Sequence, residues 1–187
     1  MVLAGPSGVG KGAIVSRLMA ARPDLKLSTS ATTRPPRPDE THGKHYLFLD
    51  PEAFDKLIAS GGLLEWAEIF GNRYGTPREP VERALAEGRT VVVEIDVQGA
   101  RQIRATLPDA YLVFIKPPNL DELERRLRTR ETETDEQVRR RLAKASEELA
   151  AEREFDATVV NDQLDEAAHE VIAIVDRLGR RTMEERK

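Results

Sequence analysis

The sequence predicts an α/β fold, with a parallel sheet that carries helices on both faces. Nearly continuous apolar runs of the kind found in doubly covered parallel strands recur at 90–96, 111–115 and 157–160, each separated from its neighbour by helical sequence. A glycine-rich stretch also joins a short apolar run at 2–4 to an amphipathic stretch. Alternating strands and helices give a parallel sheet, and 187 residues suffice for one such domain with inserted subdomains.

The composition excludes several classes of function. Charged residues make up 33% of the chain and the net charge is -4, with positive charges interspersed among negative ones, unlike a protein that coats nucleic acid. The chain has no cysteine, so it can form neither a disulfide nor a thiolate metal site. No apolar run approaches the roughly 18 residues of a membrane span. We therefore expect a cytoplasmic protein with no nucleic-acid or membrane partner.

The segment 5–11 reads GPSGVGK and lies between a predicted strand and a predicted helix. Its glycines permit positive φ values, and the backbone N–H groups of such a turn form a cradle for an anion. Lys11 can reach the β- and γ-phosphates, so the pattern GxxxxGK is a Walker A element. The following residue is usually Ser or Thr, whose hydroxyl ligates magnesium, but here it is Gly12, followed by Ala13. We therefore expect magnesium to be held through water or by groups elsewhere.

The middle of the chain breaks the alternation of strand and helix. Its prolines predict an ordered loop or an edge segment at 30–38, because proline cannot continue a helix or sit in a central strand. Thr76 opens a capping box that predicts the start of a helix. The other predicted elements are strands at 25–29, 45–49 and 63–70, helices behind the glycine-rich loop and from Pro51, and a turn at 71–75.

The last third is predicted to be mostly helical. From 121 to 154 acids and bases lie three and four residues apart, as on solvated helices held by weak surface ion pairs. Thr134 marks a second helix start, so 129–133 is expected to be a hinge-like connection. An amphipathic helix is predicted at 165–178, and the tail 179–187 is expected to be loose.

Six motifs occur in an order that resembles the guanylate kinase family over essentially the full length of the chain. They are GPSGVGK at 5–11, SATTRPPR at 30–37, GKHY at 43–46, LLEWAEIFGNRYGT at 63–76, EIDVQGAR at 94–101 and RETETDEQVRRRL at 130–142. The resemblance implies a P-loop kinase fold with a core of about 1–29, 90–124 and 142–187. It also implies an inserted GMP-binding lobe at about 30–89 and an arginine lid at about 125–141.

The reaction that the resemblance implies is transfer of the γ-phosphoryl group of ATP to GMP, with Mg²⁺, to give ADP and GDP. The implied catalytic residues are Lys11, Arg34, Arg130 and Arg141, and only one of the adjacent Arg140 and Arg141 can face the site. The implied ATP-binding residues are Gly5, Pro6, Ser7, Gly8, Val9, Gly10, Lys11, Gly12, Ala13 and Asn161. We expect a monomer or a small homo-oligomer.

The resemblance also implies how GMP is held. Its phosphate would meet Arg34 and Arg37, because guanidinium groups bind phosphate bidentately. The hydroxyls of Tyr46 and Tyr74 would add neutral donors to the same phosphate. Glu65 would accept from the guanine N1–H and 2-amino groups, with Ser30 and Thr76 as hydroxyl partners. Asp96 would orient the waters of magnesium, and Glu94 stands where the family more often has aspartate. Glu131 stands where the family often has glycine, which predicts a stiffer hinge.

Two other functions stay open. Guanylate-kinase-like domains that bind phosphopeptides use the same arginines without catalysis, and Gly12 is the residue that favours this alternative. A P-loop kinase for another nucleoside monophosphate would keep the fold and change the base pocket. Lys11 and the complete glycine-rich loop favour a kinase.

Overall fold

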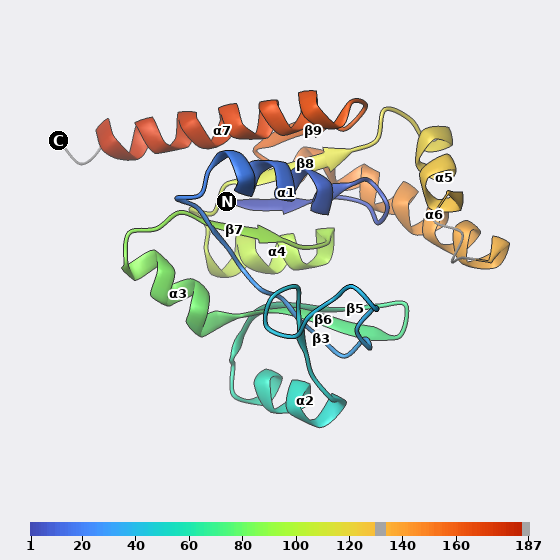
Figure 1. Cartoon of the computed structure of the whole chain (residues 1–187), viewed down its shortest axis with the longest axis horizontal. Helices are drawn as coiled ribbons and strands as arrows, with labels where there is room; N and C mark the ends of the chain where they lie inside the picture. The colour runs from blue at the N-terminus through green and yellow to red at the C-terminus, as the bar shows by residue number, and fades with distance from the viewer. Residues whose placement is uncertain (130–133, 185–187) are drawn as a thin grey trace. The chain divides into compact units, whose positions relative to one another are not determined.

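The computed structural model describes residues 1–129 and 134–184, which fall into two compact units. Unit 1 comprises residues 1, 3–23 and 111–187, and unit 2 comprises residues 2 and 24–110. Figure 1 shows the elements of both units along the chain. Each unit carries a separate set of the residues that the sequence singles out.

The larger sheet has five strands in the order β2-β7-β1-β8-β9. Its strands are β1 (Val2–Ala4), β2 (Lys26–Leu27), β7 (Val91–Glu94), β8 (Leu112–Lys116) and β9 (Ala157–Val160). In unit 2, β2 pairs with β7 in parallel, and in unit 1, β8 pairs with β9 in parallel. The first three residues of β7 and the first four of β8 are buried, as the apolar runs predict. The predicted α/β fold with a parallel central sheet flanked by helices is confirmed.

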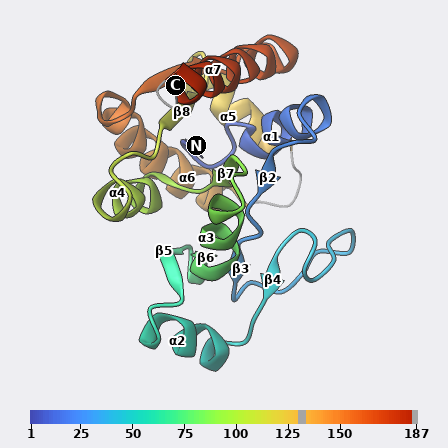
Figure 2. The same cartoon turned by 90° about the vertical axis from the view of Figure 1, so that its left-hand side faces the viewer.

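The helices of unit 1 pack in two pairs. The long C-terminal helix α7 (Leu164–Glu184) lies against α1 (Lys11–Ala21), as Figures 1 and 2 both show. Helix α5 (Leu120–Arg128) packs against α6 (Asp135–Leu149), which continues into the 3-10 helix η1 (Ala150–Glu154). Buried Leu123, Leu127, Val138 and Ala145 form the core between α5 and α6. Their spacing on the two helices gives each an apolar stripe among its charges.

Unit 2 contains a four-stranded sheet of order β4-β3-β6-β5. Its strands are β3 (Ala31–Thr32), β4 (Leu47–Phe48), β5 (Leu63–Ile69) and β6 (Asn72–Pro77). Its helices are α2 (Pro51–Ala59), α3 (Arg78–Ala86) and α4 (Val97–Thr106). Phe54 of α2 packs with Ala31 and Leu63 in a small core, and α4 packs against β5.

Several expected elements are wrong in detail. Ala31–Thr32 forms an interior strand between β4 and β6, because the prolines begin only at Pro35. Residues 72–77 form strand β6, since the chain reverses at Phe70 and Gly71, which both have positive φ. Thr76 does not cap α3, whose N-cap is Pro77. Helix α7 continues to Glu184, so most of the expected loose tail is helical.

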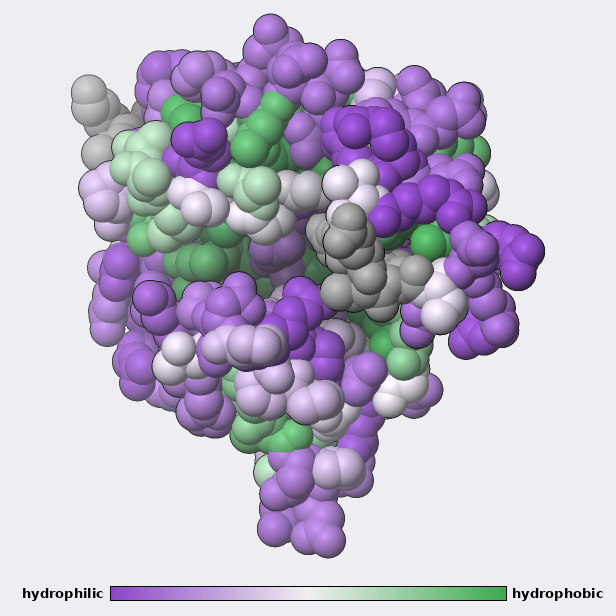
Figure 3. Space-filling view, turned by 45° about the vertical axis from the view of Figure 1, so that its right-hand side comes forward, coloured by the Kyte–Doolittle hydropathy of each residue, from purple (hydrophilic) through white to green (hydrophobic). Residues whose placement is uncertain are grey.

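Other local predictions are confirmed. Thr134 and Gln137 form a capping box at the start of α6, and Asp50 caps α2 with Pro51 at its first position. In the described part of the chain, no helix combines the length and apolarity that a membrane span requires. The face drawn in Figure 3 is mostly hydrophilic, in keeping with the large charged fraction.

Candidate active site

The glycine-rich loop of unit 1 requires its glycines for two reasons. Gly5, Gly8 and Gly10 have φ values of 151°, 88° and 92°, in the region that disfavours other residues. A Cβ atom would also lie 2.0 Å from the Ile115 carbonyl oxygen at Gly5, and 2.5 Å from Asn161 Nδ2 at Gly10. The backbone therefore passes too close to its neighbours for any side chain. The loop leads directly into the N-terminus of α1, where backbone N–H groups favour an anion.

Lys11 is the first residue of α1, and its ammonium folds back over the loop. Nζ donates hydrogen bonds to the carbonyl oxygens of Gly5 (2.7 Å) and Pro6 (3.1 Å). A point charge held within a turn of N–H groups attracts phosphate oxygens. Gly12 and Ala13 continue the helix and offer no side-chain ligand for a metal.

One of the two adjacent arginines of α6 reaches the glycine-rich loop. Arg141 Nη1 donates to Ser7 Oγ at 3.1 Å. Arg140 instead donates to Glu136 at 2.9 Å on the exposed side of the helix. Arg141 is thus the arginine that faces the loop. Arg130 and Glu131 lie outside the described residues.

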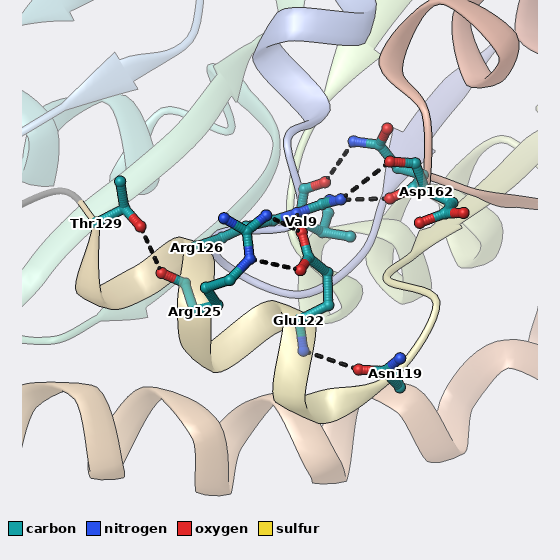
Figure 4. A network of polar contacts seen from close by, with 8 residues as sticks. Val9, Asn119, Glu122, Arg125, Arg126, Thr129 and Asp162 are labelled. Carbon is teal, nitrogen blue, oxygen red and sulfur yellow. Dashed lines mark hydrogen bonds and ion pairs between the residues drawn. The ribbon is translucent and has the colours of Figure 1, made fainter.

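Asn161, which directly follows β9, also holds the glycine-rich loop in place. It is 4% exposed, and its Nδ2 donates to the Val9 carbonyl oxygen at 2.7 Å. Arg126 of α5 donates to the carbonyl oxygens of Asn161 (2.9 Å) and Asp162 (3.2 Å), as Figure 4 shows. Glu122 accepts from Arg126 Nε at 2.7 Å. This network ties helix α5, the segment after β9 and the loop together.

In unit 2, Arg34 lies in a group with Glu40 and aromatic side chains. Its Nη2 donates to Glu40 Oε1 at 2.8 Å, and this bond chiefly raises the pKa of Arg34. The guanidinium lies 5.5 Å from the centre of the Tyr46 ring, within range of a cation–π contact. Arg37 has an exposed side chain, and its backbone N–H donates to Glu40 Oε2 at 2.8 Å.

The two predicted tyrosines come together. The rings of Tyr46 and Tyr74 meet edge to face, with centroids 6.2 Å apart. Burial, and then the negative charge of Glu94, raise the pKa of Tyr46 to about 12. The Tyr46 hydroxyl is therefore a neutral donor at ordinary pH. The structure thus gathers four predicted residues, Arg34, Tyr46, Tyr74 and Glu94, while Arg37 lies at the solvent side.

Glu65 is a buried acid whose pKa is strongly perturbed. It is 4% exposed, and its Oε1 accepts from the Thr76 hydroxyl at 2.6 Å across the β5–β6 pair. Burial raises the pKa of Glu65 to about 7, Asp96 adds to this rise, and the Thr76 hydrogen bonds oppose it. Ser30 directly precedes Ala31, which pairs with Gly75, so it lies in register near Thr76. A buried acceptor of this kind suits a ligand that brings hydrogen-bond donors.

Asp96 follows β7 and caps helix α4. Its Oδ1 accepts from the Gly99 N–H at 2.8 Å. The described residues contain no group of three or more His, Cys, Asp or Glu that could hold a metal ion. One or two carboxylates still fit magnesium, which keeps several waters and binds chiefly through substrate phosphates.

Sequence reasoning missed three residues of these groups. Glu40 has a local signal, because an acid three residues after Arg37 can accept from its backbone. Arg126 has none, since it is one of many arginines on a charged helix. Gly99 matters because a Cβ there would lie 2.4 Å from Glu65 Oε2, a contact that joins residues 34 positions apart.

Comparisons with known proteins show the family to which the chain belongs. The guanylate kinase family model matches residues 1–178. The chain is 56% identical to guanylate kinase from Thermobifida fusca (strain YX), over 93% of this chain and 89% of that one. It is 58% identical to guanylate kinase from Synechococcus sp. (strain CC9902), over 89% of each.

Solved structures give the same result. The crystal structure of guanylate kinase from Anaplasma phagocytophilum matches with a TM-score of 0.79 and 32% identity, over 94% of this chain and 83% of that one. A gluconokinase from Sinorhizobium meliloti 1021 shares the fold alone, with a TM-score of 0.52 and 18% identity. The family model and the identity over most of the chain show that this protein belongs to the guanylate kinase family.

Proposed function

We propose that the chain transfers the γ-phosphoryl group of ATP to GMP, giving ADP and GDP. It is an enzyme of the nucleoside monophosphate kinase class, and this transfer is the known reaction of its family. Within the chain, the observation that carries the choice of GMP is the buried carboxylate of Glu65, held by Thr76.

The donor nucleotide binds at the glycine-rich loop of unit 1. The loop N–H groups and Lys11 hold the ATP phosphates, with residues 5–13 forming the cradle and Asn161 keeping Val9 in place. Arg141 approaches from α6 and adds positive charge to the transferred group, together with Arg130 of the lid. Phosphoryl transfer needs alignment and charge neutralisation more than covalent help.

The acceptor nucleotide binds in unit 2. Arg34, Tyr46 and Tyr74 bind the GMP phosphate, and Arg37 completes the set when the nucleotide is present. Glu40 competes for Arg34, because the guanidinium already donates to it. Release of part of that ion pair is the cost of holding the phosphate, and the two tyrosine hydroxyls add hydrogen-bond donors.

Guanine is selected by Glu65. Its carboxylate accepts from the N1–H and the 2-amino group, with Thr76 and Ser30 as neighbours. Adenine offers neither donor, and leaving a buried carboxylate unpaired can discriminate by roughly four orders of magnitude.

Mg²⁺ bound together with ATP would neutralise part of the charge on its phosphates. Asp96 would orient its waters and Glu94 would stand beside the acceptor phosphate, while Gly12 supplies no ligand. We place the enzyme in the cytoplasm, as a monomer or small homo-oligomer that acts on free nucleotides. We propose that the chain divides functionally into a core of about 1–29, 90–124 and 142–187, a GMP-binding lobe of about 30–89 and a lid of about 125–141.

One variant tests the proposal directly. Glu65→Gln loses the charge and places an amide donor opposite the guanine donors, so kcat/KM for GMP should fall at least about tenfold. The matched control is Glu68→Gln, an exposed acid on the same strand. Assays with GMP, AMP, CMP and UMP should show the GMP preference narrowing only in Glu65→Gln. An unaltered preference would contradict the role of Glu65.

A phosphopeptide-binding function is the second candidate, favoured by Gly12. It predicts no turnover with any nucleotide, together with binding of a phosphoserine peptide that Arg34→Ala abolishes. The same assay series separates the two candidates.

A further inference from the structure

The edge of strand β5 is covered by one side chain of helix α4. β5 is the last strand in the sheet order β4-β3-β6-β5, so one side of its backbone has no strand partner. Gln102 fills this place at Trp66: the Trp66 N–H donates to Gln102 Oε1 at 3.1 Å, and Gln102 Nε2 donates to the Trp66 carbonyl oxygen at 2.7 Å. The carboxamide thus makes the two bonds that a neighbouring strand would make.

The contact between Gln102 and Trp66 lies next in sequence to Glu65, the residue proposed to select guanine. Glu65 immediately precedes Trp66, so fixing both backbone groups of Trp66 fixes where the Glu65 side chain leaves the strand. The Glu65 carboxylate then spans two elements: Oε1 accepts from Thr76 of β6, and Oε2 lies against Gly99 of α4. A β-carbon at Gly99 would be 2.4 Å from that oxygen.

Gly99 and Gln102 lie three residues apart on α4 and therefore share one face of the helix. One turn of α4 supplies the space for the carboxylate at Gly99, and the next supplies the bonds to the strand at Gln102. The same helix begins at Asp96, whose Oδ1 accepts from the Gly99 N–H. The position of Glu65 relative to α4 is thus set by side-chain bonding to the backbone as well as by packing.

We infer that Gln102 is a positioning residue for guanine selection, which acts by holding β5 so that the Glu65 carboxylate lies against Gly99 and Thr76. The inference rests on the proposed role of Glu65. Gln102 itself need not contact the nucleotide. Its loss lets water solvate the Trp66 backbone and lets the strand shift away from α4.

Gln102→Met tests this, because methionine fills a similar volume without either hydrogen bond. Loss of two hydrogen bonds predicts a rise of about tenfold in KM for GMP and a narrower preference for GMP over AMP. The KM for ATP should stay within about twofold, because the glycine-rich loop belongs to unit 1. Gln102→Glu keeps the acceptor and loses the donor, so its KM for GMP should lie between those of the wild type and Gln102→Met. Gln98→Ala, an exposed glutamine of the same helix, is the matched control and should match wild type.

A double-mutant cycle with Glu65→Gln separates the possible outcomes. If Gln102 acts through Glu65, Gln102→Met should change the GMP preference much less in the Glu65→Gln background than alone. Additive effects, or a lowered melting temperature with an unchanged GMP preference, would overturn the inference and leave Gln102 a structural residue. If Glu65→Gln alone leaves the preference unaltered, the proposed function of Glu65 has failed instead.

Discussion

The Thr76 hydroxyl donates a 2.6 Å hydrogen bond to Glu65 Oε1 across the β5–β6 pair, and both side chains are buried. This bond stabilises the carboxylate, whereas burial and the charge of Asp96 destabilise it. The balance raises the pKa of Glu65 to about 7. Glu65 therefore changes its charge within the pH range of ordinary assays. Its charge determines whether it can accept hydrogen bonds from both donors of a guanine base.

The first prediction concerns pH. Below about 7 Glu65 is protonated, and a carboxylic acid cannot accept equally from both guanine donors, so KM for GMP should fall as the pH rises from 5.5 to 8 and then level off. The limiting slope is about tenfold per unit. Stability should move the other way: the folded state holds the proton more tightly than the unfolded state, so the free energy of unfolding decreases as pH rises from about 4.5 to about 7.

The control for this profile is Glu65→Gln, whose side chain does not titrate. The phosphate of GMP also titrates, near pH 6, and that contribution persists in the variant. The difference between the two profiles isolates the carboxyl group. Identical profiles would contradict titration of Glu65 in GMP binding.

The second prediction concerns Lys11. Its ammonium bonds to the carbonyl oxygens of its own loop, so Lys11→Ala should leave the fold intact while removing charge from the transferred group. We expect kcat to fall by about two to three orders of magnitude, as for loss of other transition-state donors. GMP affinity, measured by calorimetry without ATP, should not change. Lys26→Ala, an exposed lysine of β2, is the control, and near-normal turnover of Lys11→Ala would refute the role.

The third prediction concerns Asn161. Asn161→Ala leaves the Val9 carbonyl oxygen without its donor in a buried place, which costs about 1 to 3 kcal/mol of unfolding free energy. KM for ATP should rise because the loop is less restrained, and GMP affinity should not. Asn72→Ala, which removes an exposed bond to the Phe70 carbonyl oxygen, is the matched control. An ATP KM equal to that of the control would show that the loop does not depend on Asn161.

The sequence predicts those features that rest on local pattern. The glycine-rich loop, the buried strand β7 and the Thr134 cap follow from turn chemistry, hydrophobic runs and capping, which act over a few residues. The strand at Ala31–Thr32 was missed because its partners in β6 and β4 come later in the chain. The spacing at Thr76 predicts a helix cap as well as a hydroxyl at the base site; Pro77 is the N-cap of α3, and the Thr76 hydroxyl donates to Glu65.

The candidate site shows the same limit. Glu65 could be named from a motif, but its burial and raised pKa depend on Thr76, Asp96 and the approach of α4, none of which is local. Arg126 and Gln102 have no sequence signal, because each acts on a backbone group at least 35 residues away. Sequence motifs identify the reactive side chains, whereas contacts between residues far apart in the sequence determine their burial, position and pKa.

The last prediction uses two glycines in helices. Alanine is better than glycine inside a helix by about 1 kcal/mol, so Gly179→Ala in α7, where a Cβ would meet nothing within 4 Å, should stabilise the protein and leave kinetics unchanged. Gly99→Ala in α4 gains the same helix propensity, but its Cβ would lie 2.4 Å from Glu65 Oε2 and 3.3 Å from Ile95 Cδ1. The Glu65 carboxylate must then move away from the helix, because the new methyl group would occupy its place and Ile95 prevents the methyl group from moving aside. We expect kcat/KM for GMP to fall about tenfold, the value of one lost charge-assisted hydrogen bond, with KM for ATP unchanged.

Thermal unfolding of both variants shows whether Gly99→Ala is folded, and steady-state kinetics with GMP and AMP then measure the effect of moving the Glu65 carboxylate on the preference for GMP. A folded Gly99→Ala variant with the wild-type preference for GMP would mean that the position of the Glu65 carboxylate against α4 is not what selects guanine.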